Sequence, residues 1–459
     1  EEEEEEEEEE RKGAQRGSLT YCLQNETELE VCAKLKVLLE ARGFKLTKGE
    51  MNLPFMYWAA KMHKNPVSER YITTSIDTIT KKLSQLVCKC LKLVQQQVKR
   101  HCNYKGNLDG LNRFWIASSS EPVLQGVRKL NLLRLAKNLA TYDFSTLYTN
   151  IPHQRLKDQM RWVINLAFKN NKGYPFMNVW GRGASWRKKQ NKEKTMVDKK
   201  KLIELVEFLL DNLYVKCGDM VFRQMIGIPM GSDCAPFLAN LYLFACEYQW
   251  LDKQLKRGSS GLALARKFKW TYRYIDDLLT FNNDGILGIR YKEVYGLDLV
   301  LKKETKRDSK GSFLDLDLTL NNGCCQLSTY DKRDAFPFDV RSFPDLTGNL
   351  PFKESHGVLI GQLVRFGKSC DFANHFFSRV KSLTKRLLRQ SFNEKLLFAC
   401  CRKFYVNYPH LVRRYKVDEL TLARNCFGRF SFARQRVRQS ERRKRKRERK
   451  RERKSQKKS

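Results

Sequence analysis

The sequence lacks the cysteine spacings that mark zinc sites and redox pairs. Its 14 cysteines include no Cys-x-x-Cys pair and no cysteine–histidine arrangement of the zinc-finger type. Cys324-Cys325 and Cys400-Cys401 are adjacent pairs, which suit neither a disulfide nor a zinc site. We therefore expect mostly buried, reduced thiols and a reducing compartment.

Long apolar segments are also missing. No apolar run approaches the length of a membrane span, and the amino terminus shows no signal-peptide pattern. These absences argue against a membrane partner. The chain begins with glutamate instead of methionine, from which we expect a truncated or incorrectly predicted start.

Acidic residues are scarce relative to basic ones. The chain has 88 Lys and Arg against 51 Asp and Glu, a formal net charge of +37. The acidic head 1–19 and the basic tail 431–459 are both expected to be disordered. The ten leading glutamates (−10) and the tail, with 16 Lys and Arg against 3 Glu (+13), nearly offset each other, so the basic excess is spread through the body. Such a charge favours nucleic acid as a partner, and a soluble protein with a solvated basic surface is the alternative.

Hydrophobic periodicity divides the body into elements. The pattern predicts helices at Lys129–Leu139, Lys199–Leu213 and Ala235–Trp250, a strand at Ala140–Ser145, a loop at Asn170–Asp198, hairpins at Tyr214–Ile228 and Lys269–Asn282, and a helical, basic region at Pro351–Tyr415.

The most informative stretch is Tyr274-Ile275-Asp276-Asp277, between two apolar, β-prone runs. Neighbouring side chains of a strand point to opposite faces, so an Asp-Asp pair within a strand would bury one charge. We therefore place the pair at the tip of a hairpin. Acidic groups at such a tip, in a basic chain, indicate a Mg²⁺ site of the kind used in phosphate chemistry.

A third carboxylate comes from Asp143, near the end of the predicted strand Ala140–Ser145. Asp143, Asp276 and Asp277 together would supply hard oxygen donors for two metal ions. Between them, Gly227-Ile228-Pro229-Met230-Gly231 forces a loop before a helix, where glycine lets the backbone approach a base or sugar. Each feature alone is common in proteins, and their combination carries the inference.

The order of these segments resembles that of reverse transcriptases. The segments DFSTLYTNIPH, GIPMGSDCAPFLANLYLF and YRYIDDLLTF are most similar to those of Penelope-like retroelements, whose polymerase is related to telomerase. Upstream, Tyr57–Pro66 with Arg70-Tyr71-Ile72 resembles their fingers motif. Downstream, Phe313-Leu314-Asp315-Leu316 resembles the primer grip, and Tyr330–Arg333 and His356–Asp371 resemble the thumb.

The resemblance implies a role for each matching residue. Asp143, Asp276, Asp277 and the Phe144 carbonyl would bind the two Mg²⁺ ions, with Mn²⁺ as a substitute. Tyr148 would exclude the ribose 2′-hydroxyl, although an ordinary half-buried tyrosine is the alternative. Arg70, with Lys64 or Lys61, would bind the triphosphate, and Met230 and Gly231 would pack against the nascent base pair. Lys302 or Lys303 would give a proton to pyrophosphate. The primer grip would comprise Phe313, Leu314 and Asp315.

The resemblance also implies the architecture and the reaction. We expect an α/β (α+β) right-hand polymerase with fingers and palm at 20–330, built on an antiparallel sheet backed by helices, and a helical thumb at 331–430. It would copy an RNA template into DNA from a DNA primer and deoxynucleoside triphosphates, in the nucleus if the basic tail is a localisation signal. The tail's alternatives are an RNA-binding arm and an artefact of the gene end.

Relatives of this kind often carry a GIY-YIG endonuclease after the thumb, and no such motif follows Tyr415. We therefore expect a chain that does not nick its own target. Two other functions remain open. One is a catalytically inactive nucleic-acid-binding relic of a retroelement, which three intact carboxylates argue against. The other is a telomerase-like cellular polymerase, which would need a large RNA-binding region before the fingers.

Overall fold

The protein is described from a computed structural model. It describes residues 20–62, 68–171, 173–191, 195–336, 338, 340–341, 343–419 and 422. The predicted acidic head, the predicted basic tail and Lys64 lie outside these residues. Over the described part of the chain, no helix is both long and apolar enough to cross a membrane.

The chain divides into two compact units. The first comprises the described residues up to Gly126 together with Ala136–Asp308, and the second comprises Val127–Leu135 and the described residues from Ser309 onward. This division is one of compactness, so the functional boundary predicted between 330 and 331 stays a prediction.

The first unit is built around an antiparallel four-stranded sheet with the order β10-β11-β4-β12. Its strands are β4 (Leu139–Ser145), β10 (Trp270–Tyr274), β11 (Asp277–Phe281) and β12 (Val300–Lys303). The strand predicted at Ala140–Ser145 and the hairpin predicted at Lys269–Asn282 are thereby confirmed. β4 and β11 are mainly apolar and most of their side chains are buried, as expected for the central strands of a sheet within a hydrophobic core.

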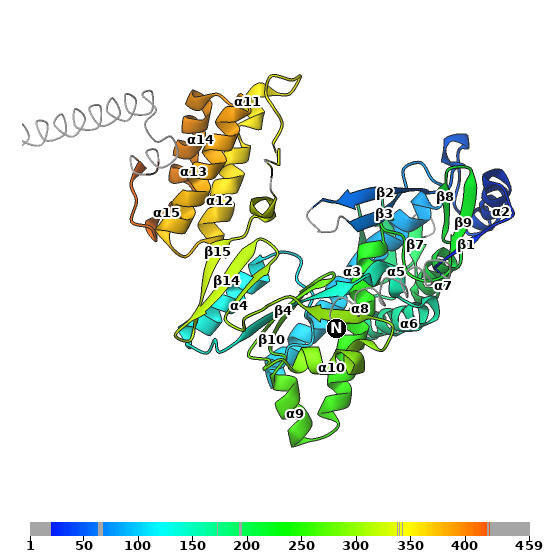
Figure 1. Cartoon of the computed structure of the whole chain (residues 1–459). Coiled ribbons are helices and arrows are strands. Elements are labelled where there is room, and N and C mark those ends of the chain that lie inside the picture. Colours follow the sequence, from blue (N-terminus) through cyan, green and yellow to red (C-terminus); the bar gives the residue numbers. More distant parts are fainter. Residues whose placement is uncertain are drawn as a thin grey trace, which may run out of the picture. The chain divides into compact units, whose positions relative to one another are not determined.

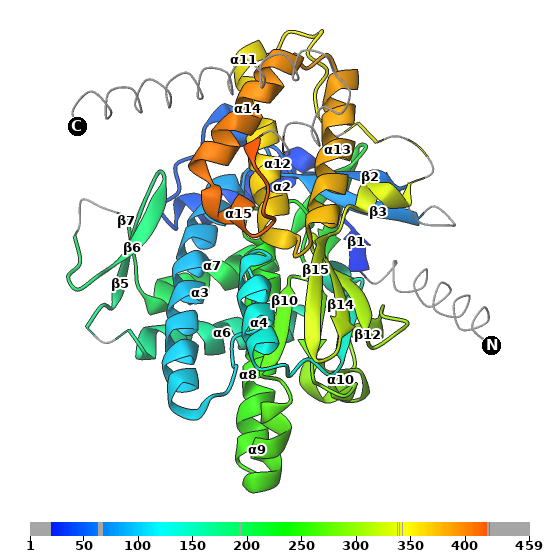
Figure 2. The same ribbon diagram turned by 90° about the vertical axis from the view of Figure 1, so that its left-hand side faces the viewer.

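The first unit also contains helices, several of which share one hydrophobic core with this sheet (Figures 1 and 2). They are α2 (Glu28–Glu40), α3 (Lys81–Asp109), α5 (Leu147–Asn150), α6 (His153–Lys169), α7 (Lys199–Asp211), α8 (Ala235–Leu255), α9 (Ser259–Arg266) and α10 (Ile286–Tyr295). The two helices predicted around α7 and α8 are confirmed. α8 is buried on nearly every side because apolar residues occupy almost all of its positions, which makes it the core of the unit.

A second sheet of the same unit has the order β1-β9-β8-β2-β3. It contains β1 (Tyr21–Leu23), β2 (Phe55–Lys61), β3 (Ser68–Thr74), β8 (Tyr214–Cys217) and β9 (Met220–Gln224). The β8–β9 hairpin turns at Gly218, which has a φ of +60°, where the sequence predicts a turn. The short helix η1 (Lys48–Glu50) precedes β2.

Two sequence predictions are wrong. The predicted loop at Asn170–Asp198 contains a three-stranded sheet, with β5 (Phe176–Trp180) between β6 (Gly183–Arg187) and β7 (Thr195–Val197). The helix predicted at Lys129–Leu139 is α4 (Glu121–Leu132), which begins and ends earlier. Leu133 and Leu135 continued the apolar pattern, but both are exposed.

The second unit combines a sheet and a helical bundle. β13 (Lys310–Phe313), β14 (Leu316–Asn321) and β15 (Cys324–Thr329) form an antiparallel sheet, and η2 (Lys332–Ala335) follows. The helices are α11 (Phe352–Ser355), α12 (Val358–Ser369), α13 (Ala373–Arg389), α14 (Glu394–Asn407) and α15 (Pro409–Arg413). The predicted helical region is thus confirmed, and these helices share an apolar core of their own.

Candidate active site

Three carboxylates meet at one end of the two central strands of the four-stranded sheet. Asp143 on β4 lies in register with Asp277 on β11, and Asp276 occupies the turn between β10 and β11. One oxygen from each carboxylate lies within 4.8 Å of the others, and all three residues are half-buried. The sequence prediction that these residues come together is therefore correct.

The turn that carries Asp276 has an unusual backbone. Tyr274 pairs with Asp277, so only Ile275 and Asp276 form the turn. Ile275 has a φ of +57°, a conformation that is costly for a β-branched residue. The Asp276 carbonyl accepts a hydrogen bond of 3.3 Å from the backbone N–H of Phe144 on β4. The strained turn is thereby tied to the strand that carries the third carboxylate.

A buried arginine supports the same turn. The Arg273 side chain is fully buried, and its guanidinium donates to the Ile275 carbonyl over 3.1 Å. It also donates over 2.8 Å to the side chain of Asn240 on α8. Sequence reasoning missed this residue, although an arginine inside an apolar strand is a signal that a buried partner exists.

That partner is Glu247, further along α8 than Asn240. Arg273 Nε donates to Glu247 Oε1 over 2.5 Å, and the Tyr295 hydroxyl donates to the same oxygen over 3.1 Å. Burial raises the pKa of Glu247, and the Arg273 guanidinium counteracts that rise. Removal of either charge would leave the other buried and unpaired, so the pair fixes β10 against α8.

The two candidate lysines of β12 lie differently. Lys302 is in register with Asp143, whereas Lys303 is in register with Tyr142. Because neighbouring side chains of a strand point to opposite faces, Lys302 shares the face of Asp143. Lys303 Nζ forms an ion pair of 2.8 Å with Asp308. The register therefore favours Lys302 of the two.

Tyr148 lies close to the carboxylates. It belongs to the short helix α5, and burial together with the nearby charge of Asp276 raises its pKa to about 12. The hydroxyl is therefore neutral at physiological pH. Its backbone carbonyl accepts a hydrogen bond of 2.6 Å from Ile228, so the glycine loop packs directly against this helix.

The loop with Met230 and Gly231 is attached to β3. Thr73 donates to the Met230 carbonyl from its backbone N–H over 2.7 Å and from its hydroxyl over 2.9 Å, and the Ser75 hydroxyl donates to the Gly231 carbonyl over 3.0 Å. Gly231 has a φ of +125°, and a Cβ there would come within 1.8 Å of the Thr73 carbonyl oxygen. Only glycine fits this approach.

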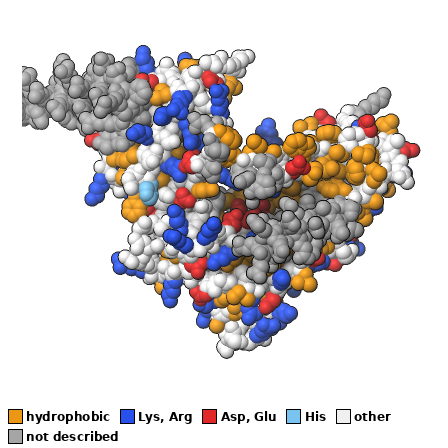
Figure 3. Space-filling view, in the orientation of Figure 1, with side chains coloured by type: hydrophobic (Ala, Val, Ile, Leu, Met, Phe, Trp, Pro, Cys, Tyr) orange, Lys and Arg blue, Asp and Glu red, His pale blue; other side chains and the backbone are white. Residues whose placement is uncertain are grey.

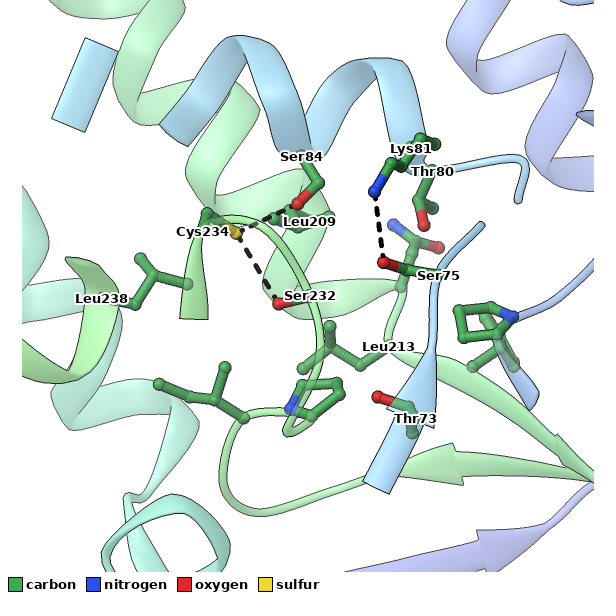
Figure 4. Close-up of a pocket in the computed structure, with 15 residues that line it drawn as sticks. Thr73, Ser75, Thr80, Lys81, Ser84, Leu209, Leu213, Ser232, Cys234 and Leu238 are labelled. Carbon is green, nitrogen blue, oxygen red and sulfur yellow. Dashed lines mark hydrogen bonds between the residues drawn. The ribbon is translucent and has the colours of Figure 1, made fainter. Parts of the chain in front are cut away.

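A pocket lies behind the loop (Figure 4). Lys81, at the start of α3, points into it and forms an ion pair of 2.9 Å with Asp233 of the loop. Sequence reasoning missed both residues, because nothing local to either one indicates the other. This ion pair and the bonds from Thr73 and Ser75 hold the loop between β3 and α3, so the pocket belongs to its support.

The predicted triphosphate contacts lie on the β2–β3 hairpin. Arg70 on β3 is exposed and pairs in register with Ala59, and Lys61 ends β2. The same hairpin has a hydrophobic surface (Figure 3), to which Trp58 and Tyr71 contribute as directly paired, exposed residues. Arg70 and the Gly231 loop are therefore joined through one strand, and Lys64 lies outside the described residues.

The predicted primer grip forms the β13–β14 hairpin of the second unit. Phe313 is buried and pairs with Leu316, and Leu314 adopts a φ of +55° in the turn. Arg365 on α12 donates to the Asp315 carboxylate over 2.7 Å, which ties the hairpin tip to the helical bundle. The segment is thus an anchored hairpin.

The carboxylate cluster fits a hard divalent cation. Mg²⁺ prefers carboxylate oxygens, and three such groups from Asp143, Asp276 and Asp277 lie close enough to share a ligand sphere. The Phe144 carbonyl belongs to the residue that follows Asp143 on β4. Charge repulsion among three carboxylates is costly without a cation, so the cluster favours the binding of one.

Comparison with known proteins supports the fold. Neither a family model nor a curated protein matches the sequence. Telomerase from Candida albicans in complex with a TWJ fragment of telomeric RNA is similar in structure, with a TM-score of 0.52, 12% identity, and coverage of 87% of this chain and 69% of that chain. Apo telomerase from Candida tropicalis matches with a TM-score of 0.43, 12% identity, and coverage of 90% and 70%.

A Sicinivirus 3Dpol RNA-dependent RNA polymerase also matches, with a TM-score of 0.33, 10% identity, and coverage of 62% and 54%. The likeness to the Candida albicans enzyme, together with the antiparallel sheet and its helices, confirms the predicted α/β right-hand polymerase fold.

Proposed function

We propose that this protein is an RNA-directed DNA polymerase of a Penelope-like retroelement, which joins deoxynucleoside triphosphates to a primer 3′-hydroxyl. The observation that carries the proposal is the meeting of three carboxylates in a right-hand polymerase fold: Asp143 and Asp277 on neighbouring strands, and Asp276 in the adjoining turn. The motifs that resemble reverse transcriptases support the choice of RNA as template and DNA as product.

Each residue acts in this proposal through its place in the fold. Asp143, Asp276 and Asp277 would hold the divalent cations, with the Phe144 carbonyl beside them. Bound Mg²⁺ would lower the pKa of the primer hydroxyl and offset the charge that develops on the phosphates. Lys302, on the same face as Asp143, would give a proton to the departing pyrophosphate.

The remaining residues would bind and select the nucleotide. Arg70 would contact the triphosphate, with Lys61 or Lys64 beside it, because a guanidinium binds phosphate oxygens in a bidentate manner. Met230 and Gly231 would contact the new base pair through the loop fixed to β3. Tyr148, close to Asp276, would exclude a ribose 2′-hydroxyl.

Primer extension tests the proposal. Purified protein, shown to be folded by circular dichroism, is incubated with poly(rA)/oligo(dT) and dTTP in the presence of Mg²⁺ or Mn²⁺. We expect incorporation that EDTA abolishes. No incorporation with either metal would contradict the enzymatic proposal and favour an inactive nucleic-acid-binding relic.

The nucleotide selection has a separate test. Tyr148→Ala should raise the use of ribonucleotides relative to deoxynucleotides, because the ring that excludes the 2′-hydroxyl is removed. The measurement is the ratio of kcat/KM for dTTP and UTP on the same primer-template. Unchanged discrimination in an active variant would remove this role from Tyr148.

A further inference from the structure

The β5–β7 sheet belongs to the first unit and lies between α6 and α7 along the chain. Figure 2 shows it beside α3. One of its faces is apolar, because Met177 and Val179 alternate along β5 and pair with Trp186 and Ala184 on β6. These four side chains belong to the core of the unit or pack against it. The opposite face of the sheet therefore points away from this core, although Asn178 at the middle of β5 on that face is itself buried.

That outward face carries an exposed aromatic ring. Trp180 ends β5, pairs with Gly183 and is 46% exposed. A Cβ at Gly183 would meet the indole at 3.3 Å, so the ring lies over the glycine of the next strand. An indole that lies against the backbone with much of its surface exposed is suited to stacking on an unpaired base.

Basic residues lie at both ends of the β5–β6 hairpin, because Trp180 pairs with Gly183 at the turn and Arg187 pairs with Phe176 at the other end. Arg182 lies in the β5–β6 turn, Arg187 ends β6, and Lys188 and Lys189 follow it, all exposed. Among the residues that the structure describes, none of these four has a carboxylate partner. Lys188 instead lies 5.3 Å from the ring centroid of Tyr174, which is itself 38% exposed.

Some cations elsewhere in the same unit are neutralised by carboxylates. Lys157 pairs with Asp211 and Lys216 with Glu28, at 2.5 and 2.6 Å. The stretch from Asn170 to Asn191 contains no acidic residue at all. A patch of unpaired cations interspersed with exposed aromatic rings complements a polyanion that also offers stacking surfaces, which describes single-stranded nucleic acid.

We propose that the outward face of the β5–β7 sheet binds single-stranded RNA at a site separate from the carboxylate cluster. The cations would contact phosphates, and Trp180 would stack on a base. The choice of RNA rests on the proposed function. The binding itself does not, since it needs neither a metal ion nor a nucleotide.

Binding of a fluorescent 20-nucleotide oligouridine RNA to the full chain in EDTA tests this proposal. We expect the combined variant R182E/R187E/K188E/K189E to weaken binding at least tenfold and to lower the slope of log K against log salt by about 0.7 for each phosphate that is no longer neutralised. In the matched control variant, glutamate replaces four exposed cations at the end of α8, in the turn after it and on α9, namely Lys253, Lys256, Arg257 and Arg266.

An equal loss of affinity in both variants would show a general charge effect and overturn the proposal. So would a quadruple variant that keeps RNA affinity but loses affinity for an oligoglutamate peptide, since that result would assign the face to an acidic protein. Circular dichroism confirms that each variant is folded.

The stacking role is tested by Trp180→Ala, which should weaken oligouridine binding about fivefold or more. Its control is Tyr104→Ala on α3, where the side chain is 67% exposed, and which should change nothing. Unchanged RNA affinity in Trp180→Ala would remove the ring from the site. Because no catalysis is measured, a chain without polymerase activity still gives a decisive result.

Discussion

Two hairpins of the first unit carry the proposed chemistry, and they are built in opposite ways. The β10–β11 hairpin has a two-residue turn, a second strand that is almost wholly buried, and a buried ion pair that supports its turn. The β2–β3 hairpin exposes Tyr57, Trp58 and Tyr71. Carboxylates that bind a metal ion must lie at fixed distances from it. A long cationic side chain, by contrast, can change its conformation to reach a phosphate.

The comparison suggests that rigidity is confined to the residues that would hold the metal and to those that support them. Arg273, Glu247 and Tyr295 are all fully buried and connected. Arg70, by contrast, is exposed on its strand. Substitutions in the first hairpin should therefore affect folding or the rate of chemistry, and substitutions in the second should mainly affect substrate binding.

The largest effect is expected from Asp276→Asn. The amide keeps the size of the side chain but removes a charged ligand, so kcat should fall about a thousandfold, or ~4 kcal/mol of transition-state stabilisation. The measurement is primer extension in Mg²⁺, with the melting temperature as control. Full activity in this variant would mean that the ligand assignment is incorrect.

Glu247→Ala should be the most damaging to stability. It leaves the Arg273 guanidinium buried without a counter-charge, at a cost of about 3–5 kcal/mol in the free energy of unfolding. The matched control is Glu69→Ala on β3, an exposed glutamate whose loss should cost less than about 0.5 kcal/mol. Thermal melts compare the two, and similar melting temperatures would refute the contrast between the hairpins.

Gly231→Ala should reduce catalytic activity, but by less than Asp276→Asn does. The new Cβ would clash with the Thr73 carbonyl at a φ of +125°, so the loop must move, and kcat/KM should fall about tenfold or more. The control is Gly218→Ala, where φ is +60° and no atom lies within 4 Å of the added Cβ. That variant should lose only about 1 kcal/mol of stability and keep its activity.

Arg70→Ala should change substrate affinity more than the rate of chemistry. Removal of charge-assisted hydrogen bonds to the triphosphate is expected to raise KM for dTTP about tenfold, with kcat reduced less. Steady-state kinetics at varied dTTP separates the two effects. A drop in kcat with unchanged KM would place Arg70 among the rigid groups and remove the difference between the hairpins.

The carboxylate cluster was predictable from sequence because its signals are local. An Asp-Asp pair between β-prone runs indicates a turn, and Asp143 lies near the end of an apolar strand. The register of β4 between β11 and β12 was not predictable, since it depends on pairing between distant segments. For the same reason, Lys302 could not be distinguished from Lys303.

Other features were missed for identifiable reasons. The strands β5 and β6 are short, and the glycines and basic residues of the turn and of β6 obscured the alternation of Met177 and Val179 on β5. The start of α4 was marked by Pro122 in its first turn, a signal that the later leucines outweighed. Glu247 lies within an apolar helix, and its partner Arg273 becomes evident only when the strand is placed against it.

The central place of β4 has a consequence for how such a chain can evolve. All three carboxylates depend on two strand pairings and one turn, and not on the length of chain between Asp143 and Asp276. New segments can therefore be added after α6 without disturbing the ligand geometry, provided that the chain returns to β10 in the same register. The β5–β7 sheet occupies such a position. A contact surface can be added there while the positions of the three carboxylates stay the same.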